Sequence, residues 1–383
     1  MRKIGIGFIG SGFAAELHTQ ALKRVPGFDL QFVGITSATF ANAQAFAKRY
    51  SFDQAYETVD ELLNDERIEV VHIITPPKSH LALIKQVMEK GKHVICEKPL
   101  IGAFGSGSDD KEAMYQQVKK ELADLDEFLK GRKEQLFYAE NYVYAPAVQK
   151  IRQVIEVTGE KFLVLRGDES HSGSHAAHAA HWSESGGGSL IRQGCHPLSA
   201  LLYLKAIEAK RRGESIEVVS VLCDSAQIGS ILKEEERGSI LSRPVDVEDW
   251  AEMIITFSDG TRAIVESADM IVGGVRNSVE AYTANACYVA NIAPNNAMMC
   301  YHGDDSNLGD VYITEKVETK MGWQHIFLAE EEMRGYVGEF EDFFQCLAEG
   351  KEAQSGFALA RQTIEVLYAA YASVAMGKRF FME

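Results

Sequence analysis

The sequence predicts an α/β domain followed by an α+β domain. Residues 1–140 are expected to form a doubly wound parallel sheet, because strand-like and helix-like segments alternate through that part of the chain. Residues 141–383 are expected to form a large, open, mainly antiparallel sheet, because strand-like segments there follow one another with few helices between them. A length of 383 residues suits two hydrophobic cores better than one.

Apolar runs predict the strands of the first domain, and amphipathic stretches between them predict its helices. The predicted strands are 4–9, 30–36, 70–75, 93–96 and 135–138. The predicted helices are 15–25, 40–49, 59–63 and 79–90. A loop rich in Gly and Ser (101–110) leads into a charged helix, 111–130, which we interpret as a solvated helix without a chemical role.

Alternating runs predict the strands of the second domain at 162–167, 216–223, 252–257, 261–267, 278–284 and 287–292. The dipeptide Asp259-Gly260 separates the third and fourth of these runs. Because Asp-Gly favours the tight turns of hairpins, we expect these two strands to pair in an antiparallel manner.

Composition and charge limit the classes of partner. A hydrophobic content of 46% with 25% charged residues is typical of a globular enzyme. The formal net charge of −16 argues against nucleic acid and anionic membranes, because both are polyanions. No apolar run approaches the ~18 residues of a membrane span. The six cysteines are widely spaced and the first strand begins almost at the N-terminus, so we expect a reduced, cytoplasmic protein without a signal peptide.

A glycine turn joins the first predicted strand to the first helix. The turn reads Gly10-Ser11-Gly12-Phe13-Ala14-Ala15. Such a turn lets the backbone approach a pyrophosphate that lies at a helix N-terminus, which is the fingerprint of a Rossmann dinucleotide site. We therefore predict that Gly10, Gly12, Phe13 and Ala14 bind NAD or NADP. The alternative is a glycine-rich turn without a ligand.

Other cofactor-binding candidates follow later strands. Thr75, Pro76 and His80 belong to a stiff loop that is expected to wall the nicotinamide ribose, although it is also explained as a rigid turn before a helix. Gly10, Ser37, Thr75 and Glu97 all fall just beyond predicted strand ends, where ligands bind in doubly wound sheets.

The end of the second strand bears on the choice of cofactor. It reads Thr36-Ser37-Ala38-Thr39 and lacks the acidic residue that binds the adenosine ribose of NAD. Nothing there would repel a 2′-phosphate, and Ser37 has a hydroxyl to donate to one. The sequence therefore leans slightly toward NADP or dual use.

Several further motifs resemble the glucose-fructose oxidoreductase/inositol dehydrogenase family, Gfo/Idh/MocA. The resemblance covers essentially the whole chain. It rests on the glycine turn, Thr75-Pro76 with His80, 91–94 running into Glu97-Lys98-Pro99, 141–146, the triple glycine 186–188 leading to Gly194-Cys195-His196, and the helix 369–373 before Gly377.

This resemblance implies hydride exchange between NAD(P) and a secondary hydroxyl of a sugar acid, sugar or polyol. It also implies a catalytic pair, here Lys98 and His196, and an open sheet that often forms the interface of a homodimer or homotetramer. Other family members act as nucleotide-binding sensors or use the cofactor transiently. We therefore keep open a redox-neutral enzyme that retains its cofactor and a non-catalytic sensor.

The two side chains suit alcohol oxidation. His196, with a reference pKa of ~6.5, is suited to accept the hydroxyl proton. Lys98, with a reference pKa of ~10.4, is expected to stay protonated and to hydrogen-bond the reacting oxygen. Glu97 is predicted to orient Lys98 or to contact the nicotinamide ribose. The alternatives are a surface lysine and a core histidine.

Arg192 departs from the family pattern, which usually has an aspartate four residues before the histidine. Arginine cannot act as a base, and it pairs with carboxylate or phosphate. We therefore hypothesise an anionic substrate such as an aldonic or uronic acid, held by Arg192. The alternative is that Arg192 forms a salt bridge within the protein.

Histidines at 171, 175, 178 and 181 precede the triple glycine. Their spacing would allow metal ligation, yet no Cys or carboxylate accompanies them, and we predict no metal. In the family this loop lies over the active site, so His181 is expected to contact substrate and Trp182 the cofactor. Asn141, Tyr142 and Tyr144 follow the last strand of the first domain and are predicted to bind substrate hydroxyls, with interface packing as the alternative.

Overall fold

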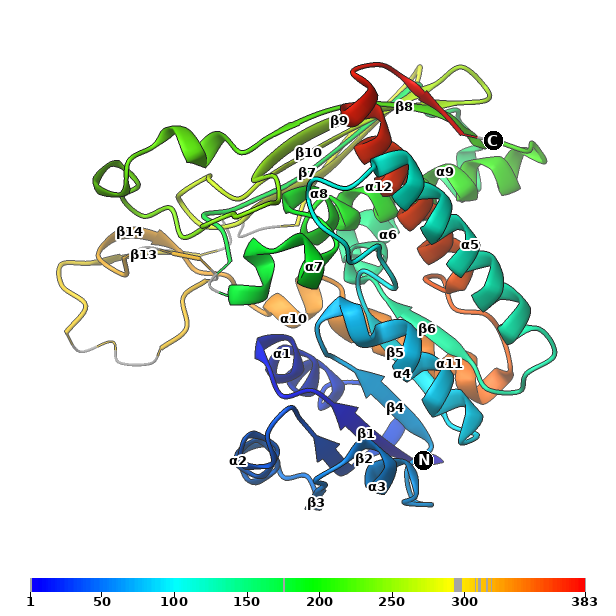
Figure 1. Cartoon of the computed structure of the whole chain (residues 1–383), viewed down its shortest axis with the longest axis vertical. Coiled ribbons are helices and arrows are strands. Elements are labelled where there is room, and N and C mark those ends of the chain that lie inside the picture. Colours follow the sequence, from blue (N-terminus) through cyan, green and yellow to red (C-terminus); the bar gives the residue numbers. More distant parts are fainter. Residues whose placement is uncertain are drawn as a thin grey trace.

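The computed structural model describes residues 2–174, 176–292, 298–306, 308, 311–314, 316–317 and 319–382. It contains two large sheets, with helices packed against both (Figure 1). The first sheet lies at the N-terminal end of the chain, and the second lies on the opposite side of the molecule.

The first sheet has six parallel strands in the order β3-β2-β1-β4-β5-β6. The strands are β1 (Arg2–Ile9), β2 (Phe28–Thr36), β3 (Gln54–Ala55), β4 (Val70–Ile73), β5 (His93–Glu97) and β6 (Leu136–Ala139). This order is that of a doubly wound sheet, with its switch point between β1 and β4, and it confirms the predicted fold class. The two-residue strand β3 was not predicted, because two residues carry no recognisable alternation.

The helices of this part are α1 (Phe13–Leu22), α2 (Phe40–Tyr50), α3 (Val59–Leu63), α4 (His80–Glu89) and α5 (Lys111–Leu129). Side chains cap three of their N-termini: Thr39 accepts from Asn42 N, Thr58 forms a capping box, and Asp110 accepts from the first turn of α5. The interpretation of α5 as a solvated helix was incomplete, because one face of it is buried against a C-terminal helix, α12 (Phe357–Met376).

The second sheet is mixed and mostly antiparallel, as predicted. Its order is β12-β11-β7-β10-β9-β8-β15, and only the pair β7 and β10 is parallel. The strands are β7 (Val164–Ser170), β8 (Val218–Ala226), β9 (Trp250–Phe257), β10 (Arg262–Ala268), β11 (Arg276–Tyr282), β12 (Cys287–Asn291) and β15 (Phe380–Phe381). The expected hairpin is confirmed, because β9 and β10 pair across Asp259-Gly260.

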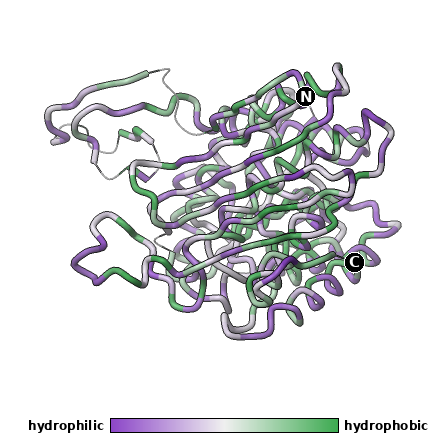
Figure 2. The backbone as a smooth tube through the Cα atoms, turned by 90° about the horizontal axis from the view of Figure 1, so that it is seen from above, coloured by the Kyte–Doolittle hydropathy of each residue, from purple (hydrophilic) through white to green (hydrophobic). Residues whose placement is uncertain are grey.

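Helices cover one face of this sheet. The helices of the second part are α6 (Pro146–Thr158), α7 (Trp182–Ser185), α8 (Ser189–Arg192), α9 (Cys195–Arg212), α10 (Glu330–Met333), α11 (Tyr336–Glu349) and α12. Of these, α9 packs on β7 and α12 packs on β8. Figure 2 looks down on the other face, where hydrophilic and hydrophobic residues mix along the strands and, in the described part of the chain, no helix lies over them.

A hairpin projects from the body of the molecule. It consists of β13 (Met299–His302) and β14 (Gly322–His325), which pair only with each other (Figure 1). Trp323 in β14 is 69% exposed. The sequence analysis did not predict these two short strands.

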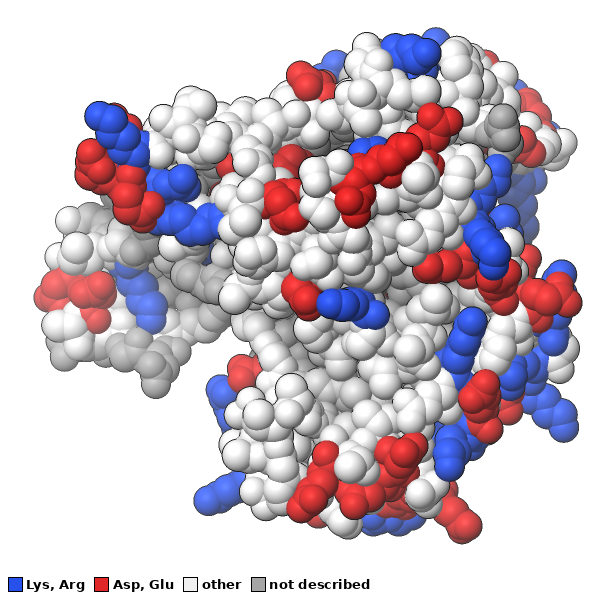
Figure 3. All heavy atoms as spheres, viewed as in Figure 1, with Lys and Arg blue, Asp and Glu red and all other residues white. Residues whose placement is uncertain are grey.

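All six cysteines are free. Within the described ranges, no helix is both long enough and apolar enough to cross a bilayer. Positive and negative side chains are interspersed on the face shown in Figure 3, and they do not form a single basic surface there. The domain boundary at residues 140 and 141 stays a prediction.

Candidate active site

A cleft of about 680 Å³ opens beyond the C-terminal ends of β1, β2, β4 and β5. One wall comes from the ends of the parallel strands, and the other from β7, the loop after it and the start of α9. Of the predicted site residues, those in the lining are Gly10, Gly12, Phe13, Ala14, Ser37, Thr75, Pro76, Glu97, Lys98, Arg192 and His196. The cleft thus brings residues from both halves of the chain together.

The turn between β1 and α1 fits a dinucleotide. Gly10 has φ +116°, and a Cβ there would lie 2.1 Å from the carbonyl oxygen of Ile74, so only glycine fits. A Cβ on Gly12 would meet nothing within 4 Å, which leaves room on the cleft side. Gly12 caps α1 without a side-chain hydrogen bond, and the first amides of a helix lack partners within the helix. The turn can therefore accept an anionic pyrophosphate.

Two hydroxyl pairs lie at neighbouring strand ends. The Oγ atoms of Ser11 and Ser37 are 2.7 Å apart, and Thr75 Oγ1 lies 2.7 Å from Ser79 Oγ. The Ser79 hydroxyl also donates to the carbonyl of Pro76. Ser37 and Thr75 thus place hydroxyl groups on the lining of the cleft, and their contacts with a dinucleotide stay a prediction.

Glu97 is held by a buried histidine that the sequence analysis did not identify. His18 on α1 places Nε2 3.0 Å from Glu97 Oε1, and its Nδ1 lies 3.1 Å from Nε2 of His72. Burial alone would raise the pKa of Glu97, but the hydrogen bond and charge of His18 outweigh it and lower the pKa to about 2. Glu97 therefore stays charged. In the sequence, the only indication of this role was that His18 lies on the apolar face of the predicted helix.

Lys98 follows Glu97 and spans the two walls of the cleft. Its Nζ donates to the carbonyl oxygen of Arg192 at 2.5 Å. Burial opposes the charged form, but the nearby side chains of Cys195, Glu97 and Glu169 outweigh it and raise the pKa of Lys98 above its ordinary value. An ammonium group has three donors, so two stay available for a ligand after the bond to Arg192. Lys98 is thus suited to act as a cation rather than a base.

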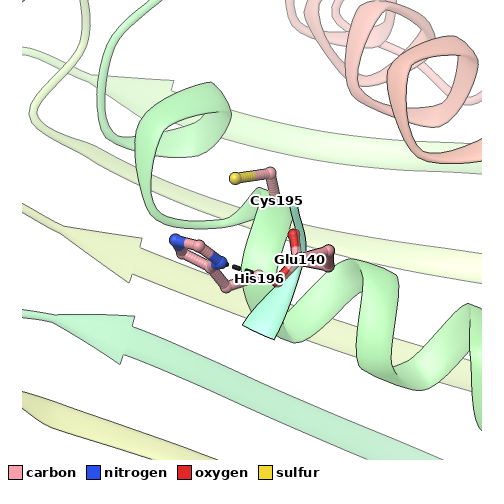
Figure 4. Close-up of side chains that lie close together, drawn as sticks. All are labelled: Glu140, Cys195 and His196. Atoms are coloured by element: carbon pink, nitrogen blue, oxygen red, sulfur yellow. Dashed lines mark hydrogen bonds and ion pairs between the residues drawn. The ribbon is translucent and has the colours of Figure 1, made fainter. Parts of the chain in front are cut away.

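His196 lies in the first turn of α9, and its imidazole faces the cleft. Its Nδ1 is 2.7 Å from Oε1 of Glu140, which follows β6 and is fully buried (Figure 4). The ring of Tyr142 stacks on the imidazole with a centroid distance of 4.9 Å. Glu140 stands one residue before the Asn141 motif and was missed. Its signal was a carboxylate directly after a strand.

The triple glycine allows the segment before α9 to pack closely against Glu248. A Cβ on Gly188 would lie 1.8 Å from the carbonyl oxygen of Glu248, so the close approach requires glycine. The buried Glu248 carboxylate accepts from the backbone N–H groups of Gly188 and Leu190. This segment therefore packs the turn that precedes His196.

Arg192 forms a salt bridge within the protein, which is the alternative left open above. Its Nη2 contacts the fully buried carboxylate of Asp269, and Gln193 Nε2 donates to the other oxygen of that carboxylate. The positive charge of Arg192 is therefore already matched. Within the described part of the chain, Arg192 Nε and Gln193 Oε1 are buried atoms without a hydrogen-bond partner.

Three further predicted residues are engaged in packing rather than lining the cleft. Asn141 Nδ2 donates to the carbonyl of Arg334, and the Tyr144 hydroxyl bonds to Asp342 and Ser355. His80 bridges two strand-end loops, with Nδ1 2.9 Å from Pro99 O and Nε2 2.9 Å from Thr75 O. These contacts hold the three side chains in place within the protein, and their binding of substrate or cofactor stays a prediction.

Trp182 is buried, its Nε1 donates to the carbonyl of Ala103, and Lys111 Nζ lies 4.1 Å from the centre of its ring. The indole thus contacts the glycine-rich loop 101–110, and Trp182 is not among the described residues that line the cleft. Its contact with the cofactor stays a prediction. Tyr142 is likewise buried, and it reaches the site through its stacking on His196.

The histidine segment is only partly as expected. His181 is exposed and stands outside the lining, whereas His171 and His178 belong to it. His175 lies outside the described residues. Among the described residues, the one group with metal-ligand spacing is Glu140, Cys195 and His196, whose ligand atoms lie within 4.8 Å of one another (Figure 4).

We interpret this group as a hydrogen-bonded pair beside a thiol. His196 Nδ1 is already engaged by Glu140, and burial raises the pKa of the Cys195 thiol well above its usual value. A thiol that stays protonated is a poor metal ligand. The absence of a bound metal stays a prediction.

Comparison with known proteins supports the motif analysis. Residues 4–125 match the family model GFO_IDH_MocA, described as an oxidoreductase family with an NAD-binding Rossmann fold. This match confirms the resemblance over residues 4–125, which form the dinucleotide-binding fold.

Curated relatives match part of the chain. Trans-1,2-dihydrobenzene-1,2-diol dehydrogenase of Mus musculus is 26% identical over 214 residues, or 56% of this chain and 59% of that protein. Levoglucosan dehydrogenase of Pseudarthrobacter phenanthrenivorans is 29% identical over 158 residues, or 39% of this chain and 40% of that protein. The chain therefore spans less than two thirds of the length of these relatives.

Solved structures match over the whole chain. GenD2 from gentamicin A biosynthesis, in complex with NAD, has a TM-score of 0.80 at 22% identity and covers 100% of this chain and 97% of that one. Levoglucosan dehydrogenase with NADH and levoglucosan has a TM-score of 0.75 at 21% identity, with coverages of 100% and 99%. These likenesses establish the fold of both halves.

Proposed function

We propose that this chain is an NAD(P)-dependent dehydrogenase of the Gfo/Idh/MocA oxidoreductase family, whose model matches residues 4–125. Its substrate would be a secondary hydroxyl group of a sugar acid, sugar or polyol. One observation carries the proposal. Lys98 and His196, contributed by different halves of the chain, line the same cleft as the glycine turn that fits a pyrophosphate.

The two residues divide the chemistry of alcohol oxidation between them. A bound nicotinamide ring supplies the hydride acceptor. Because His196 Nδ1 faces Glu140, the other ring nitrogen, Nε2, is the one available to take the hydroxyl proton. The Lys98 ammonium donates a hydrogen bond to the same oxygen and stabilises the negative charge that develops there. Glu97 fixes the start of this segment, because its Oε2 accepts from the backbone N–H of Lys98 at 2.9 Å.

The lining suits a substrate with several hydroxyl groups. Besides Lys98 and His196, the residues that line the cleft include Glu169, His171 and Gln193. Carboxylate, imidazole and amide groups accept or donate hydrogen bonds, and a hydroxyl can do both. We propose that neighbouring hydroxyls of a carbohydrate-type substrate bind to these polar residues.

A test of Arg192 shows whether its charge contributes to the binding of anionic substrates. Because Asp269 already balances its charge, we expect the charge-free double variant Arg192→Gln/Asp269→Asn to change KM for sugar acids and for neutral sugars by similar factors. The double change avoids leaving one buried charge unpaired, which would destabilise the fold. Steady-state kinetics on matched aldose and aldonic acid pairs provide the measurement. A rise in KM confined to the acids would instead establish the anionic-substrate hypothesis.

Cofactor choice is a second prediction. No carboxylate follows β2, and the lining at that end contains Ser37, Ala38 and Asn42. Because nothing there repels a 2′-phosphate, we propose that NADP binds at least as tightly as NAD. Fluorescence titration of both reduced dinucleotides measures the two Kd values. Binding of NAD more than about tenfold tighter, a gap of ~1.4 kcal/mol, would contradict this preference.

The activity is tested with a panel of sugar acids, aldoses, inositols and other polyols. Each is incubated with NAD and with NADP while reduced dinucleotide is followed by absorbance. The proposal expects at least one substrate to give sustained reduction of a dinucleotide. Conversion of a substrate without net reduction, on protein purified with its dinucleotide, would instead establish the redox-neutral alternative. Dinucleotide binding without any turnover would establish the sensor.

Assembly and location stay predictions. The uncovered face of the second sheet carries exposed apolar side chains near its edges, including Val289 in β12 and Val219 and Leu222 in β8. We propose that this face forms the interface of a homodimer or homotetramer, and that the protein works in the cytoplasm. The cysteine usage described above supports the second proposal.

A further inference from the structure

The hydrogen bond between Glu140 and His196 has features that packing alone does not explain. Glu140 is 0% exposed and His196 is 7% exposed, and Oε1 lies 2.7 Å from Nδ1. The second oxygen of Glu140 is buried without a hydrogen-bond partner among the described residues. A buried carboxylate left half satisfied is costly. Its retention beside a cleft-lining imidazole points to a role in the chemistry of that imidazole.

The hydrogen bond fixes which nitrogen can react. A carboxylate only accepts, so a neutral His196 must carry its proton on Nδ1 and direct it to Glu140. The lone pair then lies on Nε2. The ring is also held in place, because Tyr142 stacks on it with an angle of 19° between the planes. When Nε2 takes a proton, the adjacent carboxylate stabilises the imidazolium that forms.

We propose that Glu140 is the positioning residue that makes His196 the proton acceptor of the reaction. It orients the imidazole, selects the tautomer with a free Nε2, and supports the positive charge that the ring gains. This inference rests on the proposed dehydrogenase function, but it concerns an interaction that exists before any ligand binds.

Other titratable groups surround Glu140 and His196. One of them, Glu339, provides a control for the test of Glu140. Glu97 and Lys98 approach from the end of β5, Glu169 from β7, Cys195 from α9 and Glu339 from α11. Of these, Glu339 is also fully buried. Burial and the nearby charges of Glu97 and Glu140 raise the pKa of Glu339 well above its usual value. Glu339 is therefore a second buried glutamate near Glu140, and its surroundings disfavour the charged form.

The test compares Glu140→Gln with Glu140→Asp and with the matched control Glu339→Gln. The amide keeps an acceptor for Nδ1–H but removes the charge. We expect Glu140→Gln to disfavour the protonated ring of His196, because an adjacent opposite charge favours it. The acidic limb of the kcat/KM profile should therefore move to lower pH by about 1 unit or more, and kcat should fall at least about tenfold.

Histidine NMR gives a readout that needs neither substrate nor dinucleotide. The His196 resonance is assigned as the one missing from His196→Asn, and its titration midpoint is compared between variants. Glu140→Asp should reverse part of the change in the titration midpoint. Glu339→Gln should leave the midpoint within about 0.5 pH unit of wild type and kcat within about threefold. An unchanged His196 midpoint in folded Glu140→Gln would overturn the proposal. If the midpoint falls while wild type turns over no substrate, the role of Glu140 stands and the dehydrogenase function fails instead.

Discussion

Replacing Lys98 with alanine is expected to lower kcat about 10²–10³-fold, which is the usual cost of losing one preorganised donor to a developing oxyanion. The group is well placed for this role, because its ammonium lies within the cleft and its pKa stays above the ordinary value. Its loss removes the stabilising charge from the reacting oxygen and frees the carbonyl of Arg192. Steady-state kinetics on the best substrate of the panel measure the effect.

Lys90→Ala provides the matched control. Lys90 is exposed in the same domain, and its Nζ donates to Asn64 Oδ1. The Lys90→Ala variant should retain the kcat of wild type. The fall in kcat caused by Lys98→Ala should depend little on pH across the neutral range, because the wild-type amine is protonated throughout. A Lys98→Ala variant with kcat within about threefold of wild type would remove the lysine from the mechanism.

Replacing His196 with asparagine or alanine is expected to lower kcat about 10²–10⁴-fold, the range for loss of a general base. Asparagine is the more informative change, because its amide can still donate to the buried carboxylate of Glu140. Alanine would leave that charge unpaired and would also destabilise the fold. The acidic limb of the pH–rate profile should disappear in both variants.

Dinucleotide affinity shows whether the His196 variants lose catalysis alone or cofactor binding as well. His196 comes from the second half of the chain, whereas the pyrophosphate turn comes from the first. The Kd for NAD(P)H should therefore stay within about threefold of wild type, as measured by fluorescence titration. His325→Ala, an exposed histidine on β14, is the control for surface effects. A large rise in Kd together with unchanged kcat would assign His196 to cofactor binding.

The position of the cleft could be predicted because it follows from chain topology. Carboxyl ends of parallel strands meet at one edge of a sheet, so Gly10, Ser37, Thr75 and Glu97 had to lie together once the alternating pattern was recognised. The motif containing His196 could be placed in the site only through the family resemblance. Neither composition nor periodicity brings residue 196 close to residue 98.

The partners of these residues could not be predicted, because they are tertiary contacts between distant segments. Asp269 lies 77 positions from Arg192, and Glu140 lies 56 positions from His196. A single sequence carries no signal for such pairs. The hydrogen bond from Trp182 to the carbonyl of Ala103, in the distant loop 101–110, could not be predicted for the same reason. Local signals describe strands and turns, whereas burial decides which side chains reach a ligand.

The central claim is that an ammonium and an imidazole from the two halves of the chain meet at the reacting carbon. A crystal structure of the protein with bound NAD(P)H tests it most directly. The account predicts that the pyrophosphate lies on the turn at Gly10–Ala14 and that the nicotinamide ring faces both Lys98 Nζ and His196 Nε2. A dinucleotide bound elsewhere, or a ring turned away from either group, would contradict it.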